Sequence, residues 1–198
     1  MRTLFDSLVH ILNCARILNI AGRYLMNTLS PESELLAHTM TSTGETLSHL
    51  SEKSPVLLIM LRHEGCPFCR NAMSDIARLR DRIEAIGTRI VLGHMWDEKD
   101  FAAFASRYGL SALHSVADPS RALYKRLGLR RATLWQLLAP KIWWTSFKSI
   151  LEGYLPGRVK GDLFQLPGAF LIHQGQVIRS HAYRDASDRP DYVSLAMP

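Results

Sequence analysis

Long apolar runs are missing from this sequence. The longest one, PVLLIML at residues 55–61, has the length of a strand, whereas a membrane-spanning helix needs about 20 apolar residues. Internal repeats and low-complexity segments are also absent, and 47% of the 198 residues are hydrophobic against 21% charged. These proportions exclude a disordered or transmembrane chain and favour one globular domain.

Cysteine is scarce, with only Cys14, Cys66 and Cys69. Three cysteines are too few for the disulfide framework of a small secreted domain. A pair spaced as Cys66-Pro67-Phe68-Cys69 in such a chain indicates redox chemistry or half of a metal site. Cys14 is expected to be a packed apolar residue.

A secretory signal is also missing. Residues 1–27 have the apolar spacing of an amphipathic helix, but polar residues such as Asp6 interrupt it and no small-residue cleavage site follows. We interpret this extension as a docking helix, or as extra codons before a start at Met26, in preference to a targeting peptide. We therefore expect a cytoplasmic protein whose domain covers residues 28–198.

Strand and helix signals alternate through the domain, after a polar lead-in at residues 28–45. The alternation is followed by two β-rich runs around Gln174-Gly175-Gln176, which is a hairpin signal. The spacing predicts strands at 56–61 and 89–95, helices at 69–86, 97–108 and 121–127, hairpin strands at 169–173 and 177–183, and a short helix after Pro190. A parallel half followed by an antiparallel hairpin implies an α/β fold with one mixed central sheet flanked by helices.

The two cysteines lie where a strand ends and a helix opens. Free backbone N–H groups and the helix dipole stabilise a thiolate at the first turn, so Cys66 is the predicted nucleophile. Cys69 lies one turn later and can attack the resulting mixed disulfide, while Pro67 suits the first helical position. A zinc site is the weaker interpretation, because only His63 and Cys14 could complete it.

The sequence Leu166-Pro167-Gly168 precedes a predicted strand. An X–Pro bond can be cis, and a cis turn here would bring the Leu166 backbone close to the sulfurs. An extended substrate could then pair with Leu166 and Pro167, which are the predicted substrate-binding residues. An ordinary strand-initiating proline is the alternative, and the Cys-x-x-Cys favours the cis form.

These features together resemble the thioredoxin superfamily. The stretches RHEGCPFCRNAMSDI, DPSRALYKRLGLRR, KIWW and FQLPGAFLI resemble its peroxiredoxin-like AhpC/TSA branch, and within it the selenoprotein-L-related redox proteins. The similarity runs from about Leu36 to Leu195. It implies a thioredoxin-like fold and an antioxidant dithiol activity carried by Cys66 and Cys69.

Two departures from the family pattern bear on the mechanism. Thioredoxin keeps a buried acid in the strand before the motif, where this chain has leucines and Met60, so proton transfer would use His63, Glu64 or water. We interpret His63 as a plain surface residue in preference to a proton carrier. Peroxiredoxins place a Thr and a Pro before the attacking Cys. When this chain is aligned on Cys69, Cys66 stands at the Thr position and Arg62 at the Pro position, so both differ.

Acidic residues are scarce between Arg130 and Lys160, which contains only Glu152. The segment carries +5 of the net charge of +6, from Arg130, Arg131, Lys141, Lys148, Arg158 and Lys160. We read residues 130–164 as a helical insert before the proline that shapes access to the sulfurs. Its apolar stripe at helical spacing is Trp144, Phe147, Ile150, Leu151 and Tyr154. We favour a helix packed over the sheet edge or the active site, in a possible dimer contact, over one on a membrane surface or in a partner groove.

The sequence thus predicts a thiol–disulfide oxidoreductase with Cys66 as nucleophile and Cys69 as resolving cysteine. The alternatives are a thiol peroxidase, with Cys69 peroxidatic, Cys66 resolving and Arg62 or Arg70 polarising the substrate, and a non-catalytic redox sensor. The expected partners are a protein or small-molecule disulfide or peroxide and a thiol reducing system. No cofactor, metal or nucleic acid is expected, and the oligomeric state stays open.

Overall fold

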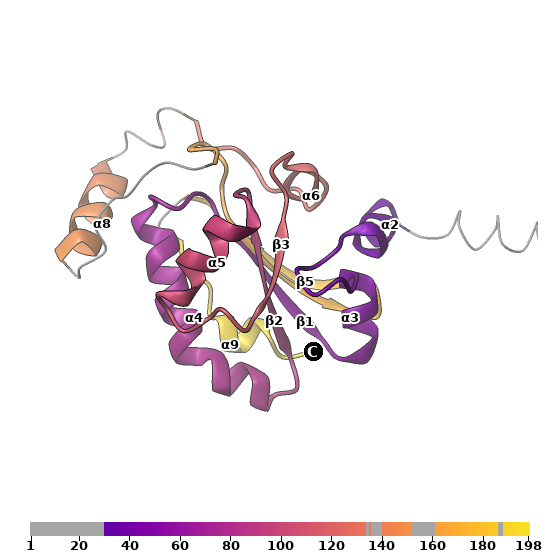
Figure 1. The fold of residues 1–198 in the computed structure, drawn as a ribbon. Coiled ribbons are helices and arrows are strands. Elements are labelled where there is room, and N and C mark those ends of the chain that lie inside the picture. The colour runs from indigo at the N-terminus through magenta and orange to yellow at the C-terminus, as the bar shows by residue number, and fades with distance from the viewer. Residues whose placement is uncertain (1–29, 134, 136–139, 152–160, 186–187) are drawn as a thin grey trace, which may run out of the picture.

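A computed structural model describes residues 30–133, 135, 140–151, 161–185 and 188–198 of the chain. They form a five-stranded mixed sheet with helices on both faces (Figure 1). The strands are β1 (Val56–Met60), β2 (Arg89–His94), β3 (His114–Ala117), β4 (Gly168–His173) and β5 (Gln176–Ala182). The helices are α2 (Pro31–His38), α3 (Leu47–Lys53), α4 (Pro67–Ala85), α5 (Glu98–Ser106), α6 (Ala122–Arg126), α8 (Pro140–Leu151) and α9 (Tyr192–Leu195).

Strand β1 occupies the middle of the sheet, whose order is β3-β2-β1-β4-β5. It pairs in parallel with β2 and antiparallel with β4, as the predicted mixed sheet requires. Every residue of β1 is buried, because helices cover both faces of a central strand. The buried strand that the continuous apolar run predicted is therefore confirmed.

Two apolar cores lie on opposite faces of the sheet. On one face α4, α5 and α9 pack around residues such as Met73 and Phe104. On the other face α2, α3 and α6 contribute residues such as Leu36, Leu50 and Tyr124. Figure 1 shows these two groups of helices on either side of the strands.

Three elements were missed by the sequence interpretation. The polar lead-in contains α2, capped by the Ser30 hydroxyl, and it is followed by α3, capped by Thr46. The Ser-Pro-Glu sequence at residues 30–32 is a helix-start signal that could have revealed α2. Strand β3 is the edge strand of the sheet and pairs in parallel with β2. Its sequence signal is weak because it has only four residues.

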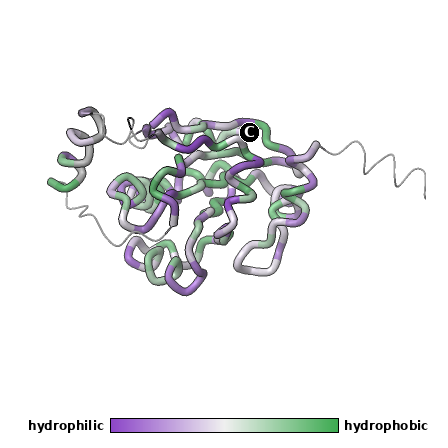
Figure 2. The backbone as a smooth tube through the Cα atoms, turned by 90° about the horizontal axis from the view of Figure 1, so that it is seen from above, coloured by the Kyte–Doolittle hydropathy of each residue, from purple (hydrophilic) through white to green (hydrophobic). Residues whose placement is uncertain are grey.

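Helix α8 confirms a helix in the insert but contradicts its expected packing. Trp144, Phe147 and Leu151 of the predicted stripe are exposed. The helix contacts α4 and stands away from the sheet in both views (Figures 1 and 2). The expectation of a stripe buried over the sheet edge is therefore wrong, because α8 packs beside α4 and leaves these side chains in water. A position over the active site and a dimer contact stay predictions.

Two further predictions concern the membrane and the N-terminus. Within the described ranges, no helix has both the length and the apolar character that crossing a membrane requires. The predicted amphipathic helix at residues 1–27, with Cys14, lies outside the described residues.

Candidate redox site

The cysteine motif lies between β1 and α4, as the sequence predicts. Cys66 is the N-cap of α4 and has extended backbone angles, with φ −77° and ψ 118°. Pro67 is the first helical residue, where its missing N–H costs no hydrogen bond. The Cys69 and Arg70 N–H groups donate to the Cys66 carbonyl oxygen, over 3.1 and 3.2 Å, and close the first turn. Local backbone chemistry therefore fixes both sulfurs at the same helix end.

Arg62, four residues before Cys66, brings positive charge to the sulfurs. Its Nη1 lies 3.5 Å from Cys66 Sγ, and its backbone N–H donates to Cys69 Sγ over 3.3 Å. The side chain is buried, and it is held by hydrogen bonds to the Gln165 carbonyl oxygen, over 2.9 Å, and to the Leu163 carbonyl oxygen. A cation fixed in this way stabilises a nearby thiolate at low entropic cost.

The two cysteines have opposite acidities. The hydrogen bond donated by the Cys69 thiol, the Arg62 charge and the N–H groups of Cys69 and Phe68 lower the pKa of Cys66 from 9.0 to about 6, against the opposing effect of burial. Burial raises the pKa of Cys69 well above 9.0, and its hydrogen bond to Cys66 raises it further. Cys66 is therefore the sulfur that ionises first, and Cys69 is the one that keeps its proton.

Both sulfurs are covered in this conformation. Cys66 is 1% exposed and Cys69 is 3% exposed. A cavity of about 10 Å³ lies against Cys69, walled by Phe68, Pro167 and Tyr183. That volume is about the size of one water molecule, so a substrate reaches the sulfurs only when neighbouring residues move.

The expectation of a cis bond before Pro167 is wrong, since the Leu166–Pro167 bond is trans. The chain reaches β4 already extended, because the Leu166 N–H donates to the Arg130 carbonyl oxygen over 3.0 Å. The Leu166 carbonyl oxygen accepts from Gln165 Nε2 over 3.1 Å. Pro167 does lie beside Cys69, whereas both backbone groups of Leu166 are already bonded within the protein.

The candidate proton carriers occupy different environments. His63 is buried, so its interpretation as a plain surface residue is wrong. Burial and the Arg62 charge lower the pKa of His63 from 6.5 to about 4, although Asp162 opposes them, and the imidazole is neutral at pH 7. Glu64 forms an ion pair with Arg107, with 3.7 Å between Oε1 and Nη2. His63 is therefore a weak base at neutral pH.

Two supporting residues were missed by sequence reasoning. Gln165 is buried, and its side chain donates to the carbonyl oxygens of Arg130 and Leu166 while its own carbonyl oxygen holds Arg62. The buried Tyr124 hydroxyl donates to the Leu61 carbonyl oxygen, next to Arg62. A polar Gln between Phe164 and Leu166 is the one signal that could have indicated such a role.

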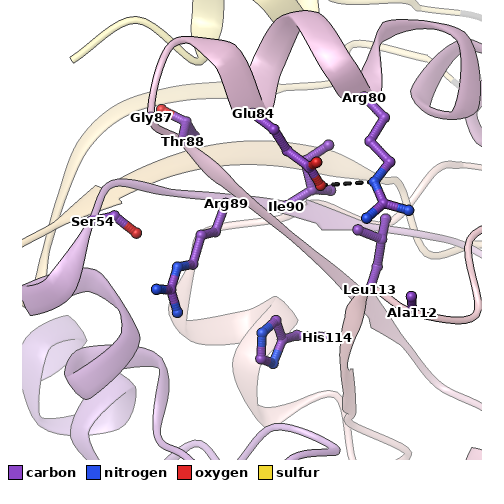
Figure 3. Close-up of a pocket in the computed structure, with 10 residues that line it drawn as sticks. All are labelled: Ser54, Arg80, Glu84, Gly87, Thr88, Arg89, Ile90, Ala112, Leu113 and His114. Atoms are coloured by element: carbon purple, nitrogen blue, oxygen red, sulfur yellow. Dashed lines mark hydrogen bonds and ion pairs between the residues drawn. The ribbon is translucent and has the colours of Figure 1, made fainter.

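A separate cavity of about 430 Å³ lies at the other end of the sheet. Arg89, which lines this cavity, pairs with Val56 at the start of β1. The cysteines follow the opposite end of β1. Figure 3 shows the Arg80–Glu84 ion pair on one side of this cavity and the Arg89 and His114 side chains on the other. It contains no sulfur and is not part of the redox site. Among the described residues, no three His, Cys, Asp or Glu side chains gather as a metal site.

Comparison with known sequences matches residues 75–185 to the family described as AhpC/TSA antioxidant enzyme. A prostamide/prostaglandin F synthase of Salmo salar is 28% identical over 172 residues, with 84% of each chain covered. Peroxiredoxin-like 2A of Homo sapiens is 24% identical over 153 residues, which cover 74% of this chain and 63% of the human one. The family match begins after Cys66 and Cys69, so it does not test their roles.

Solved structures support the fold. Peroxiredoxin Q of Xanthomonas campestris aligns with a TM-score of 0.51 at 17% identity, over 72% of this chain and 78% of that one. Peroxidoxin BcpB of Mycobacterium tuberculosis aligns with a TM-score of 0.55 at 15% identity, over 80% and 87%. The α/β arrangement is thus the thioredoxin-like fold of peroxiredoxins.

Proposed function

Because this chain belongs to the AhpC/TSA antioxidant enzyme family, we propose that it is a thiol-dependent oxidoreductase that reduces disulfides through Cys66 and Cys69. The observation that carries the proposal is the asymmetry of the pair. Cys66 receives the Arg62 charge and a hydrogen bond from Cys69, whereas Cys69 keeps its proton. An attacking thiolate beside a resolving thiol is the arrangement that thiol–disulfide exchange needs.

The reaction proceeds in two exchanges. The Cys66 thiolate attacks one sulfur of a substrate disulfide, a mixed disulfide forms, and the first substrate thiolate leaves. Cys69 then gives its proton to solvent or to that leaving thiolate and attacks Cys66 Sγ, which releases the second substrate thiolate. Two electrons pass from the dithiol to the substrate, and an external thiol reductant returns the Cys66–Cys69 disulfide to the dithiol.

Substrate entry requires the residues around the sulfurs to move. Residues 161–165 contribute the two carbonyl oxygens that hold Arg62, and they form the end of the insert and its junction with Pro167. Displacing this segment releases Arg62 and opens the Cys66 side of the site. The predicted influence of the insert on access is consistent with this connection.

A thiol peroxidase is the second candidate, and the family and the peroxiredoxin-like relatives favour it. In the version predicted from the sequence, Cys69 attacks the peroxide and Cys66 resolves. Arg62 lies beside Cys66, and it is Cys66 whose pKa is lowered, so Cys66 is favoured as the attacking sulfur in either reaction. The thiolate would attack ROOH to give a sulfenic acid and the alkoxide RO−, which takes a proton from solvent to become ROH. The second thiol would then condense with the sulfenic acid, forming the disulfide and releasing water.

Single-turnover reactions of the reduced protein test these roles. A chromogenic aromatic disulfide and hydrogen peroxide are each mixed with wild type, Cys66→Ser and Cys69→Ser, with Cys14→Ser as the matched control. We expect wild type and Cys14→Ser to release both substrate thiols and to lose two hydrogens in intact mass. Cys69→Ser should stop at the mixed disulfide, and Cys66→Ser should not react.

The outcomes separate the candidates. Rapid peroxide consumption that survives Cys66→Ser but not Cys69→Ser would reverse the roles and establish the peroxidase predicted from the sequence. Reversible oxidation without turnover, when a thiol reductant is supplied, would leave a redox sensor and overturn the enzymatic proposal.

A further inference from the structure

Helix α8 exposes a row of large apolar side chains, which we call the α8 apolar face. Trp143 is 67% exposed, Trp144 61%, Phe147 52% and Leu151 72%. Trp143, Phe147 and Leu151 follow one another at intervals of four residues, and Trp144 lies beside them. Four such side chains on one short helix form a contiguous patch of the kind that marks an interaction site.

Within the described part of the chain, this face is not packed into the domain core. None of its four side chains belongs to either apolar core. Figures 1 and 2 both show α8 outside the layers of helices that cover the sheet. Removing the apolar character of the face should therefore leave the domain folded, which makes the face testable.

Positive charge accompanies the exposed aromatics. The ammonium group of Lys148 lies 5.7 Å from the centre of the Trp144 ring. In the sequence around α8, from Arg130 to Lys160, six basic residues stand against one acid. A basic helix with Trp, Phe and Leu on one face matches the composition of helices that lie in the interface of an anionic bilayer.

We propose that the α8 apolar face binds the surface of a membrane that contains anionic lipid. The indole and phenyl rings and Leu151 enter the boundary between headgroups and acyl chains, and Lys148 meets lipid phosphate or carboxylate groups. Twelve residues of helix extend about 18 Å, so α8 lies along the surface and does not cross the bilayer. An acidic groove on another protein and a second copy of this chain are the competing occupants.

Binding of the full chain to vesicles tests the proposal. Sedimentation is compared for vesicles of phosphatidylcholine alone and of phosphatidylcholine mixed with phosphatidylserine, at low and high salt. We expect binding at least roughly tenfold stronger to the anionic vesicles, weakened by salt, with a blue shift of tryptophan fluorescence. Vesicles of each composition are also run without protein as the optical blank.

Variants assign the binding to α8 and not to another part of the chain. A fourfold variant, with Trp143→Gln, Trp144→Gln, Phe147→Gln and Leu151→Gln, should lose binding while keeping its circular dichroism spectrum. Lys148→Glu alone should weaken binding by roughly fivefold or more. The matched control removes exposed apolar side chains elsewhere, with Met40→Gln and Ile178→Gln, and should bind as wild type does.

Three results would overturn the proposal. Wild type could fail to bind anionic vesicles, or the fourfold variant could bind as well as wild type, which would assign the binding elsewhere. Wild type could also self-associate in light scattering, with that association lost in the fourfold variant and no vesicle binding in either. The last result would assign the face to a second copy of the chain.

Discussion

Cys66 and helix α8 each place a side chain in an environment that is unfavourable for it, but the two cases are opposite. At Cys66 burial disfavours the thiolate, and this effect is offset inside the fold by Arg62 and by the Cys69 thiol. On α8 apolar rings are exposed to water, and none of the described residues buries them. The first arrangement prepares a reaction within the domain, whereas the second points outward, to a surface that the domain meets.

A matched pair of phenylalanines gives the largest expected difference between the two regions. Phe104 lies on the buried face of α5 and is 1% exposed, whereas Phe147 lies on the α8 apolar face. Phe104→Ala should lower the free energy of unfolding by about 3–5 kcal/mol, because it leaves a cavity. Phe147→Ala should change it by about 0.5 kcal/mol or less. Urea denaturation followed by circular dichroism measures both, and equal losses would show that α8 is part of the cooperative core.

Removing the Arg62 charge should change the reactivity of Cys66. Arg62→Gln is expected to raise the pKa of the Cys66 thiol from its value of about 6, since the cation that favours the thiolate is gone. Below the midpoint, alkylation by iodoacetamide slows about tenfold for each unit by which the pKa rises.

Arg70→Gln is the matched control for that change. Arg70 follows Cys69 but is not among the groups that lower the pKa of Cys66, so its variant should keep the wild-type alkylation midpoint. A profile that does not move in Arg62→Gln, or that moves equally in both variants, would contradict the role of Arg62.

Tyr124 holds the backbone just before Arg62 in place through a hydrogen bond to Leu61. Tyr124→Phe removes the hydroxyl that donates to the Leu61 carbonyl oxygen and leaves that buried acceptor without this partner. The expected loss is about 1 kcal/mol in the free energy of unfolding, with the same m-value as wild type. An unchanged denaturation midpoint would mean that the hydrogen bond contributes no net stability.

The smallest effect is expected at His63. Because the pKa of His63 is lowered to about 4, the ring stays essentially neutral between pH 5 and 9 and does not change its charge there. His63→Ala should therefore leave the midpoint of the alkylation profile of Cys66 unchanged in that range. A shift of the midpoint would restore His63 as a participant in proton transfer.

Sequence patterns predicted the parts of the molecule that local chemistry determines. The apolar run of β1, the cysteines at the start of α4 and the Asp97 cap of α5 all follow from nearby residues, and the structure confirms these elements. The residues that tune the site are held by distant ones. Arg62 depends on the carbonyl oxygens of Leu163 and Gln165, about a hundred positions later in the chain, and no local pattern encodes such a contact.

The errors have the same origin. The bond before Pro167 is trans in a chain segment that Arg130 already holds extended, and the environment of His63 depends on neighbours from across the fold. The stripe on α8 had the spacing of a packed helix, and spacing alone does not say what covers a face. Periodicity therefore identified the helix, and tertiary structure decided which side of it meets water.

In the proposed dithiol reaction, the hydrogen bonds into the two sulfurs also favour one direction of electron flow. Arg62 donates to Cys69 Sγ from its backbone and to Cys66 Sγ from its guanidinium group. A thiolate accepts such bonds strongly and gains from the positive charge, whereas a disulfide carries no charge to be stabilised. These contacts therefore favour the reduced form and raise the reduction potential of the pair. A chain poised in this way accepts electrons readily from other dithiols and passes them only to more oxidising substrates.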